Sequence, residues 1–254
     1  MVPHLFRRSY SCPYGLGHQS QYHRMIRMEE DNILLFDKPY GWTSFDVVNS
    51  VRYTLKKFTG KKHLRVGHAG TLDPLATGLL IICSGKETKN IEKYQALEKE
   101  YTGTFHLGAT TPTFDLESEP GNFKDISFLK PLHIHEAALR FTGEQQQIPP
   151  LFSAIKIEGK RAYQYAREQE EINLDHKTII IYQFEIIRTE FPEVDFRIVC
   201  SKGTYIRAIA RDFGEYLGCG AYLKSLRRTR IGNFDVKDAF DIETFKSSLY
   251  HKLE

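Results

Sequence analysis

The stretch GHAGTLDPLATG, at residues 67–78, holds the densest set of residues that could carry chemistry. Its glycines permit positive φ angles or a close approach of the backbone to another molecule. Pro74 restricts Asp73 to extended geometry, so the carboxylate is held outward from a stiff turn. Such an aspartate could be a nucleophile, although Asp-Pro in a glycine-rich loop is also a common turn. The spacing matches neither the phosphate loop nor the dinucleotide fingerprint.

A second candidate group, SKGTYIR, covers residues 201–207 and joins an expected strand to an expected helix. Tyr205 and Arg207 fall in the first turn of that helix, next to its positive end. This position suits the binding of an anion, and a guanidinium can hold a carboxylate with two parallel hydrogen bonds. On local grounds alone, a surface arginine and a half-buried tyrosine are the simpler interpretation of the pattern.

Tyr101 is the third candidate, at the start of an alternating segment and directly after Lys99 and Glu100. A tyrosine at such a place packs in the core by default, but its ring could instead be a stacking platform for a nucleic-acid base. No HExxH pattern or paired Cys/His spacing indicates a metal site.

The cysteines and the apolar runs indicate a protein of a reducing, aqueous compartment. Cys12, Cys83, Cys200 and Cys219 show no CxxC spacing, so we expect free thiols. The longest apolar runs have the length of strands and are far shorter than a membrane span.

The formal net charge of +3 comes from the N-terminal segment. Residues 1–28 contain arginines but no acidic residue, and the rest of the chain is nearly balanced in charge. The composition loosely resembles a transit peptide, but a leader or a wrongly assigned start is the simpler interpretation, because Met28 leads directly into the first expected strand. We therefore expect 1–28 to be disordered and 29–254 to form the folded domain.

Three local clusters of basic residues could contact nucleic-acid phosphates. Charged runs are also common on solvated faces, so the clusters leave an RNA partner open. They lie at residues 56–65, 156–167 and 224–230.

Hydrophobic patterning predicts a mixture of strands and helices. Ser44 is placed to cap a helix that ends near Phe58. The buried stripe expected for this helix is Phe45, Val48, Val51 and Leu55. Further strands are expected at 32–36, 79–83, 101–107, 178–187 and 194–200, and further helices at 134–141, 206–217 and 221–227. This order is not a regular βαβ alternation, which favours an α+β fold with a mixed sheet.

Several motifs, in order along the chain, resemble those of the TruB-type pseudouridine synthases. Residues 67–78 match the family signature GHxGTLDPxAxG, and residues 201–207 are similar to its SKGTYIR motif. The other matches are DKPYGWTS at 37–44, KEY at 99–101, QIPPLFSAIK at 147–156 with GKRAY at 159–163, and LRRT at 226–229. Together they extend over nearly all of the chain after residue 32.

The resemblance implies that Asp73 is the nucleophile that attacks the target uridine. Arg207 would pair with that carboxylate and orient it, and Tyr205 would lie close to the base as a partner for proton transfer. The isomerisation breaks the C1′–N1 bond, turns the base and forms a C1′–C5 bond, which an aspartate ionised at neutral pH can start. A nearby arginine would keep it ionised despite burial. The sequence leaves open whether Asp73 attacks C6 of the base or C1′ of the ribose.

The resemblance implies that four further residues surround the extruded nucleotide. Tyr101 would stack on the flipped uracil, and His68 would contact the RNA near it. Leu226 would form an apolar wall, and Lys38 would support the site rather than act in it. No cofactor and no metal is implied.

The fold implied by the resemblance is the pseudouridine synthase fold, a mixed and largely antiparallel sheet flanked by helices. An insertion around residues 120–170 would contact the RNA. The substrate would be uridine 55 in the TΨC arm of tRNA, and we expect a cytoplasmic monomer with no membrane partner. Family members often carry a small C-terminal RNA-binding PUA domain, for which the residues after Phe234 are too few. In addition, Ser118 stands where the family's TxTxDxEG stretch usually has glycine.

Two other classes of function remain. A non-catalytic RNA-binding protein could keep the fold, but it would not need Asp73, Tyr101, Tyr205 and Arg207 together. A glycoside hydrolase would need a second carboxylate as its acid. The nearest acidic pair in a motif-like stretch is Asp115 and Glu117.

Overall fold

The computed structural model describes residues 32–153, 156–157, 160–161 and 174–250. The interpretation of residues 1–28 as a leader therefore lies outside the described residues, as does part of the expected RNA-contacting insertion. In the part of the chain that is described, no helix is long and apolar enough to cross a membrane.

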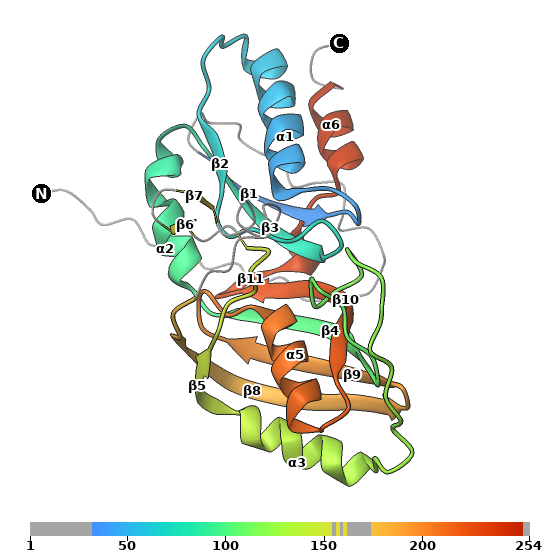
Figure 1. The fold of residues 1–254 in the computed structure, drawn as a ribbon. Coiled ribbons are helices and arrows are strands. Elements are labelled where there is room, and N and C mark those ends of the chain that lie inside the picture. Colours follow the sequence, from blue (N-terminus) through green and yellow to red (C-terminus); the bar gives the residue numbers. More distant parts are fainter. Residues whose placement is uncertain (1–31, 154–155, 158–159, 162–173, 251–254) are drawn as a thin grey trace, which may run out of the picture.

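Strands and helices alternate irregularly along the chain (Figure 1). The helical elements are α1 (Ser44–Thr59), η1 (Gly85–Asn90), α2 (Ile91–Ala96), α3 (Pro131–Phe141), α5 (Ile206–Tyr216), η2 (Val236–Asp238) and α6 (Ile242–Tyr250). The strands are β1 (Ile33–Lys38), β2 (Val66–His68), β3 (Thr77–Ser84), β4 (Lys99–Leu107), β5 (Gly143–Gln147), β6 (Lys156–Ile157), β7 (Lys160–Arg161), β8 (Lys177–Glu190), β9 (Glu193–Cys200), β10 (Ala221–Ile231) and β11 (Phe234–Asp235).

One large sheet runs through the molecule in the order β1-β3-β10-β4-β9-β8-β5, with β2 on β3 and β11 on β10. The pairing of β10 with β3 is parallel, whereas all the other described pairs of named strands are antiparallel. The predicted fold class, a mixed and largely antiparallel sheet flanked by helices, is confirmed.

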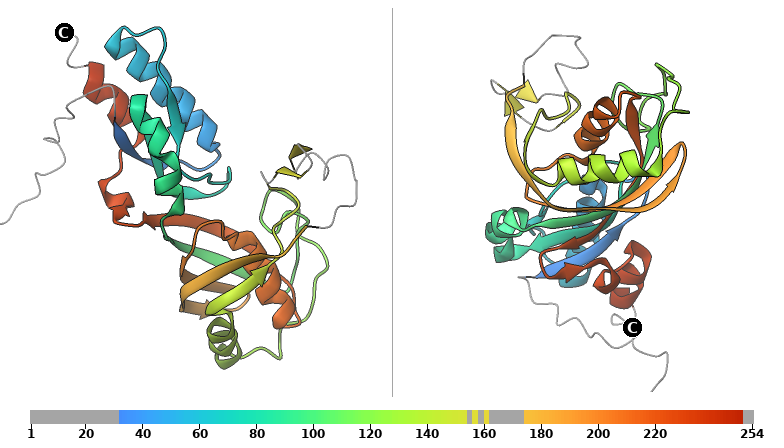
Figure 2. Two further views of the ribbon diagram at one scale, coloured as in Figure 1. Left: turned by 90° about the vertical axis from the view of Figure 1, so that its left-hand side faces the viewer. Right: turned by 90° about the horizontal axis from the view of Figure 1, so that it is seen from below.

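The helices cover the two ends of the sheet separately (Figures 1 and 2). At one end, α1 and α6 pack on β1 and β3 around a core that includes Phe36 and Phe245. At the other end, α3 and α5 pack on β4, β8 and β9 around Phe105, Phe196 and Phe213. The ring of Phe105 stacks on that of Phe196, with 4.1 Å between centroids. The active-site candidates come from both ends.

Strand β3 is buried on both faces, which explains its unbroken apolar run. Leu80 and Ile82 pack towards α1 and α6, whereas Leu79 and Ile81 join a third core beside α2. A strand covered on both sides does not alternate between apolar and polar residues. The rigid strand leads directly out of the Asp73 loop.

The structure corrects the start and the buried face of α1. The N-cap is Thr43, whose side chain accepts from the backbone of Asp46 at 3.1 Å while the Asp46 carboxylate accepts from the backbone of Thr43 at 2.8 Å. This reciprocal capping box occupies the position before Ser44. Phe45 is 59% exposed and therefore lies off the buried stripe, although Val48 is buried as expected.

The helix predicted at residues 221–227 is wrong, because this segment is part of β10. Register shifts lie between Leu223 and Ser225 and between Arg228 and Arg230. Each such bulge moves the following side chains to the other face, so the alternation that marks a strand is lost in the sequence. The strand nevertheless pairs with β4 on one side and β3 on the other.

The described cysteines are buried free thiols, as the sequence indicated. Burial raises the pKa of the Cys83 thiol to about 11 and that of Cys200 to about 12. These two thiols remain protonated at neutral pH and act as core residues.

Candidate active site

Asp73 lies on the loop between β2 and β3, and the loop backbone is fixed on both sides of it. The Leu72 amide donates to the Ser44 hydroxyl at 2.8 Å, and this hydroxyl donates back to the Leu72 carbonyl at 3.1 Å. On the other side, the Pro74 carbonyl accepts from the Lys38 ammonium at 3.1 Å. The side chain of Asp73 itself is 37% exposed, so the expected burial of this carboxylate is not observed in the free protein.

Lys38 is fully buried beneath this loop. Besides Pro74, its ammonium donates to the carbonyls of Pro39 at 3.0 Å and Trp42 at 2.5 Å. Burial lowers the pKa of Lys38 to about 8, although the negative charge of Asp73 opposes the shift. The side chain ties the turn after β1 to the loop that carries Asp73.

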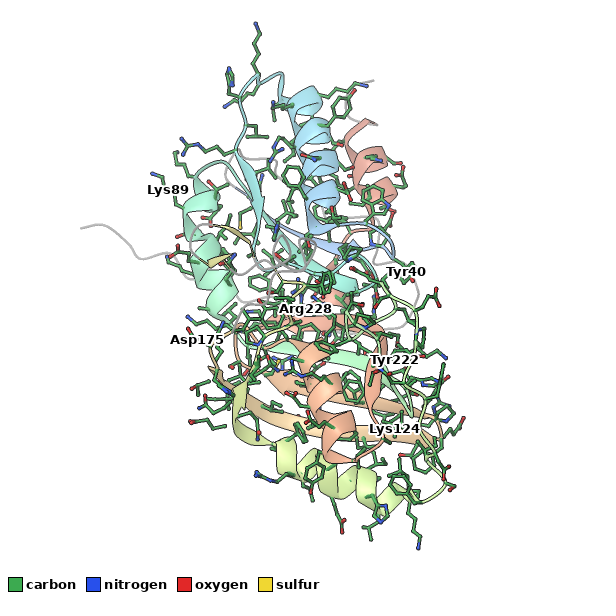
Figure 3. The ribbon with its side chains drawn as sticks, in the orientation of Figure 1. Tyr40, Lys89, Lys124, Asp175, Tyr222 and Arg228 are labelled. Carbon is green, nitrogen blue, oxygen red and sulfur yellow. The ribbon has the colours of Figure 1, made fainter. Side chains whose placement is uncertain are left out.

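Arg228 holds the same loop from β10, deep in the molecule (Figure 3). It is 1% exposed, and its guanidinium donates to the carbonyls of Leu79 at 2.8 Å, Gly70 at 3.0 Å and Thr71 at 3.3 Å. Gly78 has a φ of 102°, and a Cβ atom there would lie 2.3 Å from the Arg228 carbonyl oxygen. Only glycine permits this contact between the end of the loop and β10.

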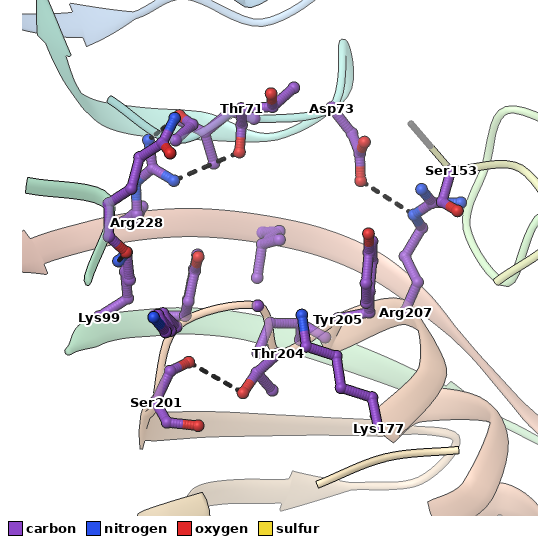
Figure 4. A pocket seen from close by; sticks show the side chains of 18 residues that line it. Thr71, Asp73, Lys99, Ser153, Lys177, Ser201, Thr204, Tyr205, Arg207 and Arg228 are labelled. Atoms are coloured by element: carbon purple, nitrogen blue, oxygen red, sulfur yellow. Dashed lines mark hydrogen bonds and ion pairs between the residues drawn. The ribbon is translucent and has the colours of Figure 1, made fainter. Parts of the chain in front are cut away.

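Arg207 approaches Asp73 from the first turn of α5, where its side chain is only 6% exposed (Figure 4). Its Nε donates to Asp73 Oδ2 at 2.9 Å. Its Nη1 and Nη2 donate to the carbonyls of Thr113 at 3.0 Å and Phe152 at 2.9 Å. The expected pairing with Asp73 is present, but as one hydrogen bond rather than two parallel ones, because the rest of the guanidinium binds two other segments.

A second carboxylate, that of Asp115, also faces this guanidinium. Its Oδ2 lies 3.5 Å from Arg207 Nε, and its Oδ1 accepts from the Thr113 hydroxyl at 2.6 Å and the Glu117 amide at 3.0 Å. Asp115 is 5% exposed. Arg207 is therefore held between one buried carboxylate and one that reaches the surface.

Tyr101 and Tyr205 face the same cavity from β4 and from the start of α5. Burial raises the pKa of the Tyr101 phenol, and the positive charge of Arg228 opposes this. Burial also raises the pKa of Tyr205. Both phenols are protonated at neutral pH and can donate hydrogen bonds. Leu226, on β10, adds an apolar wall.

The cavity has a volume of about 440 Å³ and a strongly positive lining (Figure 4). Its basic residues are Lys99, Lys177, Lys202, Arg207 and Arg228. Among the described residues that line it, Asp73 is the single carboxylate. Such a wall concentrates negative charge from solution around one reactive acid.

Comparison with known protein families decides the family. Residues 56–206 match the model of the TruB family pseudouridylate synthase N-terminal domain, and residues 207–254 match that of the tRNA pseudouridylate synthase B C-terminal domain. The chain belongs to the TruB family.

Two curated relatives in the TruB family illustrate the degree of similarity. The tRNA pseudouridine synthase B of Flavobacterium johnsoniae is 52% identical over 221 residues, which cover 87% of this chain and 96% of that protein. That of Chloroherpeton thalassium is 51% identical over 211 residues, covering 83% and 87%.

Solved structures support the fold of the TruB family member. A chain in the crystal structure of a Cbf5-Nop10-Gar1 complex has a TM-score of 0.67 and 28% identity, covering 89% of this chain and 56% of that one. A chain in a structure of an H/ACA RNP bound to a substrate RNA containing 2'-deoxyuridine has a TM-score of 0.61 and 26% identity, covering 86% and 53%. This chain thus spans about half the length of these two neighbours.

The TruB motif residues do not all reach the cavity. Asp73, Tyr101, Tyr205, Arg207 and Leu226 line it together, although they come from four segments of the chain and two ends of the sheet.

Lys38 and His68 lie outside that lining. The hydrogen bonds that the Lys38 ammonium forms with described residues go to backbone carbonyls. His68 is on β2, opposite Ile82 of β3. Burial, assisted by the charge of Arg228, lowers the pKa of His68, so its imidazole is neutral at pH 7. Its expected contact with RNA stays a prediction.

The sequence did not predict two buried residues that support the site, Asp115 beside Arg207 and Arg228 beneath the Asp73 loop. Asp115 was considered only as a possible glycosidase acid, but neither it nor the exposed Glu117 lines the cavity. The acid of a glycoside hydrolase must reach the substrate, whereas Asp115 is buried and is held by Thr113, Glu117 and Arg207. Arg228 was assigned to a basic surface. Asp115 lies in the TxTxDxEG-like stretch and Arg228 in the LRRT motif, so both motifs pointed to residues of the site. Nothing in the motifs shows which of their side chains is buried.

The basic cluster at residues 224–230 is not a phosphate-binding surface as a whole. Arg228 is buried, and Arg227 forms two hydrogen bonds with the carboxylate of Asp37, at 3.0 and 2.6 Å. Lys224 pairs with Glu193, and Arg230 pairs with Glu98 at 3.0 Å. The cluster at 56–65 remains a candidate, whereas much of that at 156–167 lies outside the described residues.

Proposed function

We propose that the chain isomerises uridine 55 in the TΨC arm of tRNA to pseudouridine, with Asp73 as the nucleophile. Membership of the TruB family makes the chain a pseudouridine synthase, and its curated relatives carry the name tRNA pseudouridine synthase B. The choice of uridine and the part played by each residue are what we add.

One observation carries the proposal: the partly exposed Asp73 carboxylate faces a cation-lined cavity and is paired with a buried arginine. A nucleophile must be both ionised and accessible. The 2.9 Å hydrogen bond from Arg207 places a positive charge beside the carboxylate, and the 37% exposure leaves the carboxylate within reach of an extruded nucleotide.

In this mechanism the RNA supplies a flipped uridine whose base enters the cavity. Tyr101 stacks on the uracil and Leu226 bounds it on an apolar side. Asp73 attacks the base at C6 or the ribose at C1′, the C1′–N1 bond breaks, and the base turns. The C1′–C5 bond then forms, the bond to Asp73 breaks and regenerates the carboxylate, C5 loses its proton, and N1 gains one. Tyr205, protonated and beside Asp73, is placed to take part in this proton movement.

The positive lining provides contacts for the phosphates on either side of the flipped nucleotide. Lys177 and Lys202 are exposed at the cavity, and Lys89 lies at the surface near α2 (Figure 3). Binding should therefore weaken steeply with added salt. We further propose that the enzyme acts as a cytoplasmic monomer and that His68 contacts the RNA beside the extruded base.

Incubation with an unmodified tRNA transcript, followed by mapping of pseudouridine, tests the proposal. We expect one pseudouridine, at position 55, and none in a transcript with cytidine there. Tight binding without any isomerisation would instead favour the non-catalytic RNA-binding alternative. Modification at another uridine would refute the assigned position while leaving the family activity intact.

A further inference from the structure

Helix α5 begins after a residue whose side chain cannot cap the helix N-terminus. The N-cap position is Tyr205, and no side chain of a local residue accepts from the first turn there. Tyrosine is not among the residues that cap helices, since it has no short side-chain acceptor. The backbone of the tyrosine that faces the cavity therefore needs another support.

That support is the side chain of Gln147, at the end of the edge strand β5. Its Oε1 accepts from the Tyr205 amide at 2.8 Å, and its Nε2 donates to the Tyr205 carbonyl at 3.1 Å. The same carbonyl accepts the helical hydrogen bond from Ile209 at 3.1 Å, so both of its acceptor positions are occupied. Gln147 is 3% exposed. The amide pairs with the backbone of Tyr205 as a neighbouring strand would.

The residues that follow Gln147 hold the next turns of α5. The Phe152 carbonyl accepts from Arg207 Nη2 at 2.9 Å, and the Ile148 carbonyl accepts from Arg211 Nη2 at 2.9 Å. The segment 147–153 therefore forms hydrogen bonds with three residues at the start of α5, namely Tyr205, Arg207 and Arg211. The pair formed by Gln147 is the one that binds the backbone of α5 rather than a side chain.

We propose that Gln147 is a positioning residue for the isomerisation: its amide fixes the backbone of Tyr205 and so places the phenol and, two residues further on, the Arg207 guanidinium. The reciprocal pair requires a donor and an acceptor in one neutral planar group. A glutamate of the same shape would present only acceptors when ionised, and one of them would face the Tyr205 carbonyl. When protonated, it would have one donor and one acceptor again.

The test is the variant Gln147→Glu, with Gln146→Glu as its matched control. Gln146 is on the same strand but exposed, and its side chain forms a hydrogen bond with the Thr178 hydroxyl at 3.0 Å. Single-turnover rates on the tRNA transcript are measured between about pH 6 and pH 8.5, the range in which a buried glutamate titrates. Melting temperatures and tRNA affinity are measured in the same buffers.

For Gln147→Glu we expect a loss of about 10- to 100-fold in rate at the upper pH, the size of effect of a displaced catalytic group. Relative to wild type, the rate should recover as the pH falls, with tRNA affinity unchanged. Gln146→Glu should follow the wild-type profile throughout. A Gln147→Glu variant that keeps the wild-type rate and profile would overturn the proposal.

A neutral variant covers the case in which Gln147→Glu does not fold. Gln147→Met is similar in shape but lacks both hydrogen-bonding groups, so its rate should be reduced equally at every pH; a folded variant with the wild-type rate would refute the proposal. Because the proposal rests on the proposed role of Tyr205, Tyr205→Phe is measured in parallel. Wild-type turnover in Tyr205→Phe would refute that role, whereas identical Gln147→Glu and Gln146→Glu profiles would refute only the role of Gln147.

Discussion

The two segments that meet at the cavity are held in opposite ways. In the Asp73 loop, Ser44, Lys38 and Arg228 bind the backbone and leave the carboxylate of the proposed nucleophile partly exposed. At the start of α5, the reactive side chain is itself held, since Arg207 donates to a carboxylate and two carbonyls while almost fully buried. From this difference we expect that Asp73 can leave its partner to reach a substrate, whereas Arg207 stays in place.

This arrangement divides the chemistry from the support. The loop carries a partly exposed carboxylate on a backbone that is held in place, and α5 places a fixed positive charge beside that carboxylate. Preorganised charge of this kind stabilises a reacting anion without reorganisation during the reaction. Substitutions can test whether the two segments differ as the contacts indicate.

The largest effect is expected for Asp73→Asn, which removes the negative charge of the partly exposed carboxylate. The amide keeps the shape of the carboxylate but has no negative charge, so isomerisation should fall to background. Affinity for tRNA should stay within about tenfold, because separate basic residues contact the phosphates. Single-turnover assays and filter binding measure the two properties. Activity within tenfold of wild type would remove Asp73 from the nucleophile's role.

Arg207→Lys should come next, with most of the turnover lost although the charge is kept. A lysine ammonium is a point donor and cannot reach Asp73, Thr113 and Phe152 with the geometry of a planar guanidinium. The matched control is Arg211→Lys, one turn further along α5, which should keep nearly wild-type turnover. If Arg207→Lys instead retained turnover but bound tRNA more weakly and with more salt sensitivity, Arg207 would be a phosphate contact.

Asp115→Asn should have a smaller effect, because it leaves the Asp73–Arg207 contact in place. The amide can still accept from Thr113 and Glu117 at Oδ1, but the second negative charge beside the guanidinium is lost. We expect turnover to fall by about tenfold and the melting temperature to decrease, since the one buried carboxylate beside Arg207 loses its charge. Asp125→Asn, at an exposed turn, is the control. Unchanged turnover would mean that Asp73 alone orients Arg207.

The sequence predicted the two side chains that meet at the cavity better than the residues that support them. Glycine spacing and Asp-Pro mark Asp73 as an outward-pointing residue, and the strand-to-helix junction places Arg207 at a positive helix end. The supports could not be predicted in the same way, because Arg228, Asp115 and Gln147 act through contacts between segments far apart in the chain. The β-bulges of β10 also interrupt the alternation of its residues, so the sequence did not indicate that this segment is a central strand or that Arg228 is buried in it.

Lys38→Met gives the smallest expected effect and tests the support of the Asp73 loop through its pH dependence. In the folded protein burial lowers the pKa of Lys38 to about 8 from a reference value of 10.5. Between these values the unfolded chain binds more protons at this position than the folded one, so the free energy of unfolding rises with pH. The slope from one group is at most about 1.4 kcal/mol per pH unit. Methionine cannot titrate and should lose this slope.

Lys99, also buried and with a pKa lowered to about 8, contributes with the same sign. Only the difference between wild type and Lys38→Met therefore isolates Lys38. Denaturant unfolding at intervals from pH 8 to about pH 9 measures that difference, below the range where most tyrosines titrate. The difference should shift in favour of wild type as the pH rises, while the exposed control Lys62→Met should run parallel to wild type. A constant difference would mean that the ammonium is not desolvated, and hence that Lys38 does not clamp the loop from a buried position.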